Sequence, residues 1–153
     1  MFRGLNAVAI DVKGRISIPA RSRDLLKEEA EGMMVITIDP EECCLLLYSY
    51  PQWETIEKKL ADLPTFNPSV RRIQRLLIGH ATDVEMDRNG RLLLPPLLRE
   101  YAGLDKTTMM VGQGNKFEIW GESQWRLARD AWLADGLQDD NGVVPVELST
   151  LSL

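Results

Sequence analysis

The residues best suited to chemistry in this sequence are two aspartate–arginine pairs with the same spacing, in the segments Asp11–Arg15 and Asp87–Arg91. Glycine stands just before the arginine in both segments, as Gly14 and Gly90. A carboxylate at the head of a turn accepts hydrogen bonds from backbone N–H groups two or three residues later. An arginine across the turn can pair with that carboxylate, or it can bind a phosphate or a guanine edge. The spacing therefore predicts a rigid turn that presents a guanidinium group.

Catalysis by these carboxylates is the first alternative. Asp11, Asp87 and Glu85 could be metal ligands for phosphoryl chemistry. However, an arginine and a turn glycine beside each aspartate would lower its pKa and occupy its lone pairs. The sequence contains no phosphate loop and no nucleophile–base pair, and its single histidine and adjacent Cys43-Cys44 pair have no zinc-site spacing. We therefore expect no enzymatic activity, catalytic residue, metal, cofactor or small-molecule substrate.

The chain contains an internal repeat. Residues 11–19 align with residues 87–95 at an offset of 76, with aspartate, glycine, arginine and proline at equivalent positions. The match continues through Arg23 and Arg99, and the offset then changes to 72. At the second offset, Leu47-Tyr48 and Gln52-Trp53 match Ile119-Trp120 and Gln124-Trp125. Such a duplication predicts a pseudo-symmetric protein.

Each repeat has signals for a strand, a turn, a second strand and a helix. Lys13-Gly14 and Asn89-Gly90 mark the turns, because asparagine and glycine accept positive φ angles. Pro19 and Pro95 suit the first turn of a helix. The expected elements are strands 6–10 and 16–18 with helix 20–30, and strands 81–86 and 92–94 with helix 96–102. A hairpin and a helix follow in each repeat, at 33–38, 45–48 and 51–63 and at 109–111, 117–120 and 122–133.

Charge is distributed unevenly along the chain. The net charge of −5 argues against nucleic-acid binding if only the total counts. However, residues 1–27 have a net charge of +4, and residues 118–153 have a net charge of −5. Because screening limits the reach of distant charge to about 8–10 Å, a basic end can attract a polyanion locally. The cations of this end are Arg3, Lys13, Arg15, Arg21, Arg23 and Lys27.

The remaining segments connect or extend the repeats. A helix is expected at 68–78, because Asn67-Pro68 is a typical helix start. Its Arg71, Arg72 and Arg75 form a solvated face, an intersubunit ion-pairing face or a phosphate-binding face. We expect a first repeat at 1–50, connecting helices at 51–79, a second repeat with its C-terminal helix at 80–135, and a flexible acidic tail at 136–153. Without a long apolar stretch or a signal peptide, the protein is expected in the cytoplasm and not in a membrane.

The sequence resembles the bacterial MraZ family, which belongs to the wider AbrB-like swapped-hairpin class. The pattern Asp-x-x-Gly-Arg-apolar-x-apolar-Pro occurs twice, and the resemblance covers residues 1 to about 135. The opening Met-Phe-Arg-Gly and the segments 75–81 and 115–120 make it specific. The resemblance implies an α+β fold, in which two tandem AbrB-like β–turn–β–helix repeats form a pseudo-symmetric small β-barrel core with flanking helices.

The resemblance also implies a function. MraZ proteins are nucleoid-associated transcriptional regulators that bind direct repeats upstream of the division and cell-wall gene cluster containing their own gene. They assemble into rings of several subunits. The expected partners are therefore double-stranded promoter DNA and further copies of the chain. An AbrB-like antitoxin, whose acidic tail occupies a toxin, and an oligomeric scaffold without specific DNA binding remain as alternatives.

The family's Asp-x-x-x-Arg motif maps onto Asp11/Arg15 and Asp87/Arg91. Pro96 follows Pro95 directly and lacks an N–H group, so we expect the first repeat, with its basic charge, to face DNA. The arginine of the second repeat would chiefly complete the fold and the ring. Alternatively, the ion pair only locks the turn in at least one repeat. The expected DNA-binding residues are Arg15, Lys13, Arg3, Arg21 and Arg23.

Overall fold

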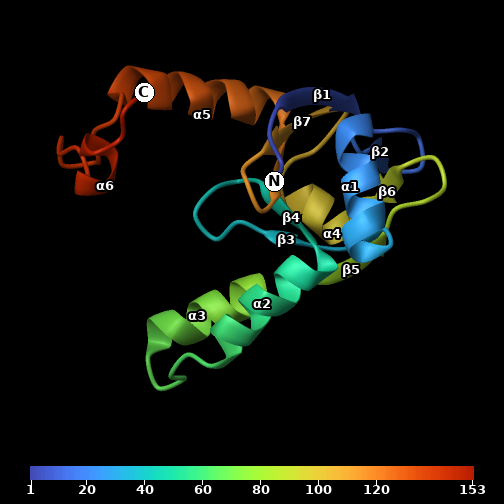
Figure 1. The fold of residues 1–153 in the computed structure, drawn as a ribbon, viewed down its shortest axis with the longest axis horizontal. Helices are drawn as coiled ribbons and strands as arrows, with labels where there is room; N and C mark the ends of the chain where they lie inside the picture. Colours follow the sequence, from blue (N-terminus) through green and yellow to red (C-terminus); the bar gives the residue numbers. More distant parts are fainter. The chain divides into compact units, whose positions relative to one another are not determined.

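The computed structural model describes residues 1–153, which form two compact units, Met1–Glu122 and Ser123–Leu153. The first unit contains a six-stranded sheet, a two-stranded ribbon and four helices (Figure 1). Its elements are β1 (Leu5–Ala9), β2 (Arg15–Ser17), α1 (Ala20–Ala30), β3 (Met33–Ile38), β4 (Leu45–Ser49), α2 (Tyr50–Ala61), α3 (Pro68–Leu77), β5 (Thr82–Glu85), β6 (Arg91–Leu93), α4 (Pro96–Tyr101), β7 (Thr107–Gly112) and β8 (Phe117–Gly121). The predicted strands and helices are confirmed, with ends that differ by at most two residues.

The large sheet contains three strands of each repeat, in the order β1-β7-β8-β4-β3-β5 with antiparallel neighbours. The first strand of each repeat pairs with the hairpin of the other repeat. Leu5 of β1 lies opposite Val111 of β7, and Thr82 of β5 lies opposite Ile36 of β3. The two repeats therefore fold as one unit and share one core.

The pairing follows the duplication of the sequence. In the ribbon of β2 and β6, Ile16 lies opposite Leu92, and these residues are equivalent at the offset of 76. At the centre of the large sheet, Leu46 of β4 lies opposite Glu118 of β8, and these residues are equivalent at the offset of 72. An approximate two-fold axis therefore passes through both pairs.

The prediction of a small β-barrel is wrong in one respect, because no barrel closes. Strands β1 and β5 are the edges of the large sheet, and β2 and β6 pair only with each other. The ribbon strands have three residues each and are followed within two residues by Pro19 and Pro95. Since proline has no N–H group to donate, these strands cannot extend into longer ladders. The core is covered by an open sheet and a separate ribbon.

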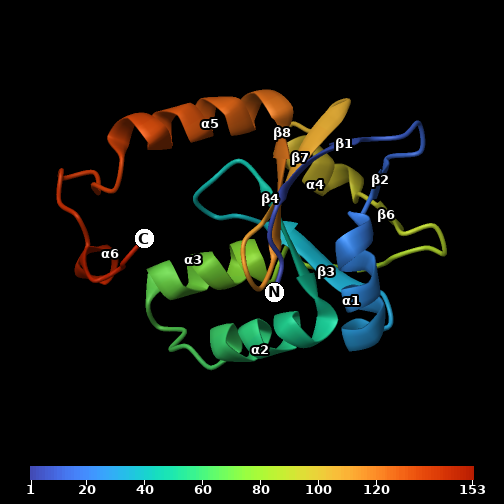
Figure 2. The ribbon, with the colours of Figure 1, turned by 45° about the horizontal axis from the view of Figure 1, so that its top comes forward.

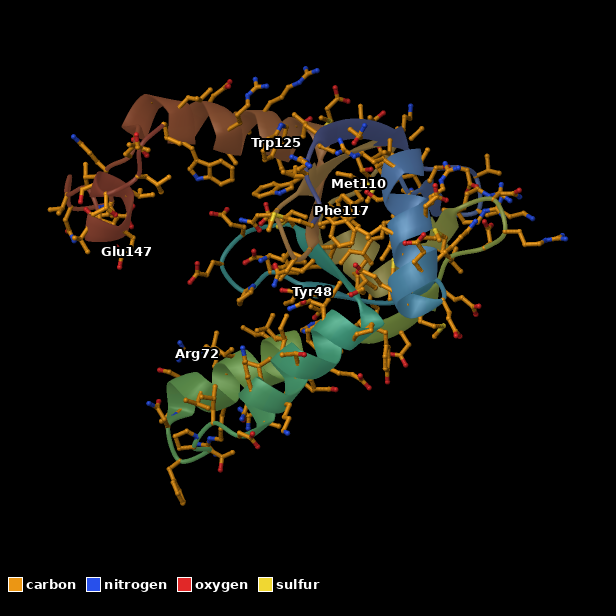
Figure 3. The ribbon with its side chains drawn as sticks, in the orientation of Figure 1. Tyr48, Arg72, Met110, Phe117, Trp125 and Glu147 are labelled. Atoms are coloured by element: carbon orange, nitrogen blue, oxygen red, sulfur yellow. The ribbon has the colours of Figure 1, made fainter.

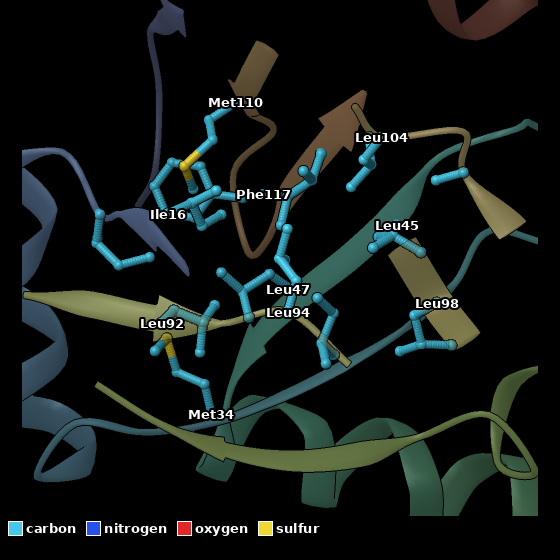
Figure 4. Packing of buried hydrophobic residues seen from close by; sticks show 14 of the residues in the cluster. Ile16, Met34, Leu45, Leu47, Leu92, Leu94, Leu98, Leu104, Met110 and Phe117 are labelled. Carbon is cyan, nitrogen blue, oxygen red and sulfur yellow. The ribbon is translucent and has the colours of Figure 1, made fainter. Parts of the chain in front are cut away.

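The core of the first unit draws apolar side chains from both repeats. Ile16 and Leu92 of the ribbon face the large sheet, which contributes Met34, Leu47 and Phe117 (Figure 4). Every residue of β4 is buried, because helices α2 and α3 pack on the other face of the central strands. This packing positions the turns that precede β2 and β6.

The second unit contains α5 (Glu122–Asp135), which begins at the last residue of the first unit, and α6 (Val146–Ser149). On α5, the rings of Trp125 and Trp132 meet edge to face, with centroids 5.9 Å apart. A short turn, residues 139–143, lies between the helices. None of the helices in either unit combines the length and the apolarity that crossing a membrane requires.

Candidate nucleic-acid interface

A single carboxylate organises the first turn. One oxygen of Asp11, Oδ1, accepts hydrogen bonds from the backbone N–H groups of Lys13 and Arg15, each at 2.9 Å. The other oxygen, Oδ2, accepts from Nε of Arg15 at 2.8 Å. The backbone N–H of Gly14 donates to the Asp11 carbonyl at 3.0 Å, and Gly14 has a φ of +85°. The predicted rigid turn with a guanidinium at its end is confirmed.

The second turn repeats this geometry. Oδ1 of Asp87 accepts from the backbone N–H groups of Asn89 and Arg91 at 2.9 Å, and Oδ2 accepts from Nε of Arg91 at 3.2 Å. Gly90 has a φ of +74°. Neither arginine uses its terminal Nη atoms in a bond within the protein. Both guanidinium groups can therefore bind an external acceptor without breaking the turn.

A third turn, in the second unit, has the same hydrogen bonds without an arginine. Oδ1 of Asp139 accepts from the backbone N–H groups of Asn141 and Val143 at 2.9 Å, and Gly142 has a φ of +76°. The hydrogen bonds match those of the other two turns, but valine stands where they have arginine. Because aspartate and glycine suffice to close this turn, Arg15 and Arg91 are not required for closure.

The carboxyl groups of Asp11 and Asp87 have lowered pKa values, chiefly because the backbone N–H of Arg15 or Arg91 donates to the ionised form. We expect both groups to titrate at a lower pH in the folded protein than in the urea-unfolded chain, where the pKa of aspartate is about 3.9. The ionised carboxylates then stabilise the folded turns above the unfolded pKa, and this stabilisation is lost as pH falls through the lowered pKa. Carbon-detected NMR titration of the carboxyl groups measures both midpoints. A folded-state midpoint at or above that of the unfolded chain would contradict the turn geometry.

The tips of the two turns differ in their exposed side chains. Val12 and Lys13 are exposed on the first turn, and Arg88 and Asn89 are exposed on the second. Both turns project from the same side of the first unit (Figures 1 and 2). Arg88 is a candidate that the sequence analysis missed, although its place beside Asn89-Gly90, at the tip of a predicted turn, could have indicated it.

The turns are held by the opposite repeats. The carbonyl of Gly90 accepts from the backbone N–H of Ile18 at 2.8 Å, and that of Gly14 accepts from Leu94 at 3.0 Å. Arg23 is half-buried, donates from Nε to the Ile18 carbonyl at 2.7 Å, and lies against Gly90. Arg23, predicted to bind DNA, thus supports the second turn. Its role in DNA binding stays a prediction.

The five predicted DNA-binding residues occupy three places. Lys13 and Arg15 lie on the first turn, and Arg23 lies beside the second. Arg3 and Arg21 line a separate cavity beside the start of α1. Helix α3, which includes the basic residue Arg72, packs beside α2 and lies away from both turns (Figures 2 and 3).

One group of side chains has the composition of a metal site. Donor atoms of Asp39, Cys44 and Glu118 lie within 4.8 Å of one another. Burial raises the pKa of both the Cys44 thiol and the Glu118 carboxyl group, which favours their protonated forms. The thiol donates to Oδ2 of Asp39 at 3.9 Å, and the Trp120 indole donates to Glu118 at 3.2 Å. Each of the three groups therefore has a hydrogen-bond partner within the chain.

Comparison with known proteins identifies the family. A family model described as "MraZ protein, putative antitoxin-like" matches residues 1–76 and 77–132. A Coxiella burnetii protein named "Transcriptional regulator MraZ" is 61% identical over 153 residues, and the match covers 100% of both chains. Proteins of the same name from Legionella pneumophila and Halorhodospira halophila are 56% and 50% identical, also over 100% of both chains. The match covers both repeats and both Asp–Arg turns, and the chain belongs to the MraZ family.

Proposed function

We propose that the protein is a sequence-specific DNA-binding transcriptional regulator that acts on direct repeats upstream of its own division and cell-wall gene cluster. The observation that carries this proposal is the comparison of the three turns. The third turn closes with valine in place of arginine, whereas the two turns on the shared ribbon have arginines with unbonded terminal nitrogens. A guanidinium that is not needed for closure is available for recognition. The names of the relatives support the same class of function.

The ribbon of β2 and β6 is the proposed reading element. A two-stranded ribbon fits the major groove, where arginine binds guanine O6 and N7. In this arrangement Arg15 reads a base, and Lys13 at the exposed tip binds a phosphate. The exchange of first strands between repeats supports an AbrB-like swapped-hairpin fold, with repeats at 1–50 and 80–135 joined by helices at 51–79. Residues 136–153 would form an acidic tail that is flexible as a whole and keeps the Asp139 turn and α6 as local structure.

Several copies of the chain would act together. One protomer presents few contacts, and linkage in a ring multiplies the modest affinity of each contact on tandem DNA repeats. We therefore propose a ring-like homo-oligomer in the cytoplasm, associated with the nucleoid. In this role the protein needs no catalytic residue, metal, cofactor or small-molecule substrate.

The second candidate function is that of an antitoxin, which the description of the family model favours. If the protein is an antitoxin, we expect a small basic partner to co-purify with it and to bind the acidic segment after residue 135. A bare ring without affinity for promoter DNA would instead indicate a scaffold.

A gel-shift experiment with DNA from upstream of the gene tests the main proposal. Tandem repeats should bind more tightly than scrambled DNA of the same length and composition. Affinity should fall steeply between 50 and 200 mM salt, with a slope that counts the phosphates contacted. Equal affinity for the scrambled duplex would contradict sequence-specific regulation.

A further inference from the structure

A polar cavity of about 340 Å³ lies where the first strand of the first repeat meets the start of α1. The residues that line it include Arg3, Asn6, Pro19, Ala20, Arg21 and Ser22. Two of these are cations, and no acidic side chain lines the cavity. The cavity is therefore suited to an anion.

The backbone at the start of α1 adds donors to the cavity. The helix has 11 residues, and no side chain caps its first turn. The N–H groups of Ser22 and Arg23 donate to the carbonyl of Pro19, whereas those of Ala20 and Arg21 have no backbone acceptor. Unused N–H groups and the helix dipole favour an anion at such an end.

Ser22 supplies an independent sign of a ligand. It is only 8% exposed, and its hydroxyl group makes no hydrogen bond within the chain. The hydroxyl is not fully enclosed, so it keeps contact with solvent and is free to donate to a ligand. Since Ser22 lines the cavity, an acceptor bound there would satisfy this hydroxyl.

The position of Arg3 is determined by its neighbours. Phe2 is buried against Phe117, with ring centroids 4.6 Å apart, and its backbone N–H donates to Gly114 at 2.7 Å. On the other side, the carbonyl of Gly4 accepts from Gly112 at 2.9 Å. The backbone on both sides of Arg3 is thus attached to the hairpin of the second repeat. Little of the backbone freedom of Arg3 therefore remains to be lost when a ligand binds, although its exposed side chain must still be ordered.

The second repeat lacks this chemistry. Its nearest counterpart is a cavity that shares only the equivalent positions Thr82 and Pro95, and it is lined also by Asp83, Val84, Glu85 and Leu93, two of which are acidic. At the offset of 76, Arg3, Ala20, Arg21 and Ser22 of the first repeat correspond to Gly79, Pro96, Leu97 and Leu98. The cations, the hydroxyl and one backbone N–H are therefore present only in the first repeat.

We propose that the cavity at the start of α1 binds one phosphate group, and that this group belongs to the backbone of the DNA read by the first turn. This assignment of the source rests on the proposed function. Arg15 and Ala20 are five residues apart, which is at most about 17 Å of extended chain. The major groove is about 12 Å wide, so the turn and the cavity can reach the same duplex. Free inorganic phosphate offers the same chemistry and is the other source to test.

Two substitutions and one control test the site in the full chain. Arg21→Gln removes a cation, and Ser22→Ala removes the buried hydroxyl, while Lys59→Gln removes an exposed charge from α2 as the control. We expect Arg21→Gln to weaken duplex binding about tenfold and Ser22→Ala to weaken it severalfold. The control should retain native affinity. Ser22→Ala should also leave the melting temperature close to the native value, because the hydroxyl makes no hydrogen bond within the chain, and this result separates a binding role from a structural one.

Duplexes with a single neutral methylphosphonate linkage locate the phosphate. At one linkage, the modification should weaken duplex binding by the native protein about tenfold. The same modification should hardly change the affinity of the Arg21→Gln variant, which already lacks the contact. Calorimetry with inorganic phosphate then tests the cavity without DNA. In one outcome, the native protein binds inorganic phosphate but not the duplex, and Arg21→Gln abolishes the phosphate binding. This outcome would support the anion site and contradict the proposed function. Duplex binding that neither substitution weakens, together with no phosphate binding, would overturn the inference.

Discussion

Replacement of Arg15 by alanine is expected to reduce affinity for operator DNA by about fivefold to 150-fold for each contacting protomer. This range corresponds to the roughly 1–3 kcal/mol that one arginine–guanine contact contributes to discrimination. The loss should be largest for the preferred duplex, so that native and scrambled DNA bind with similar affinity. Fluorescence anisotropy with both duplexes measures the two effects.

The turn should survive the Arg15→Ala substitution. Its two backbone hydrogen bonds to Asp11 remain, and the third turn closes with valine at this position. The lost ion pair is partly exposed, so the free energy of unfolding should change little. Arg91→Ala is the matched control, and it should weaken binding less, because the second repeat lacks a basic cavity beside its turn. Equal affinity of the Arg15→Ala and native proteins, or loss of the oligomer, would contradict this role.

Replacement of Gly112 by alanine is expected to lower the free energy of unfolding by about 2–3 kcal/mol. A Cβ at this position would lie 2.5 Å from the backbone N and Cα of Arg3. The backbone of Arg3 is held between the Phe2–Gly114 bridge and the Gly112–Gly4 hydrogen bond and cannot move aside as a flexible side chain can. The segment that leads into β1 must therefore shift away from the end of β7. The shift should also displace Arg3 from the cavity and weaken DNA binding. Urea unfolding with DNA binding on the same samples measures both losses.

Gly114→Ala is the control for this prediction. Gly114 has a φ of +77°, and no atom lies within 4 Å of an added Cβ. Its substitution should therefore cost only the backbone strain, about 1 kcal/mol. If Gly112→Ala lowers the free energy of unfolding no more than Gly114→Ala does, the N-terminal segment is loosely attached to β7, contrary to the pairing described above.

The local elements were predictable because their signals lie within a few residues. The Asp–Gly turns depend on hydrogen bonds that span four residues, and helices α1, α3 and α4 begin at or beside prolines and end near glycines. The repeat itself required only comparison of the chain with itself. Arg15 and Arg91 could therefore be placed at turn ends without a structure.

The partners of the strands were not predictable in this way. A turn of the Asp11–Arg15 type is typical of hairpins, yet β1 pairs with β7, about a hundred residues away, and β2 pairs with β6. All strands offer the same backbone donors and acceptors, so the choice of partner depends on which arrangement buries the apolar faces. The open sheet and the separate ribbon follow from that choice, and the expected closed barrel did not form.

The two Asp–Arg pairs show which features depend on the local sequence and which depend on the tertiary structure. The sequence by itself determined that each pair closes a turn and presents a guanidinium, because aspartate, glycine and arginine interact over four residues. Only the tertiary structure decided that both turns flank one ribbon, that Arg23 supports the opposite repeat, and that Ser22 lines a cavity with Arg3. These relations join residues far apart in the chain, and shared burial of both repeats brings them together. No local pattern encodes them.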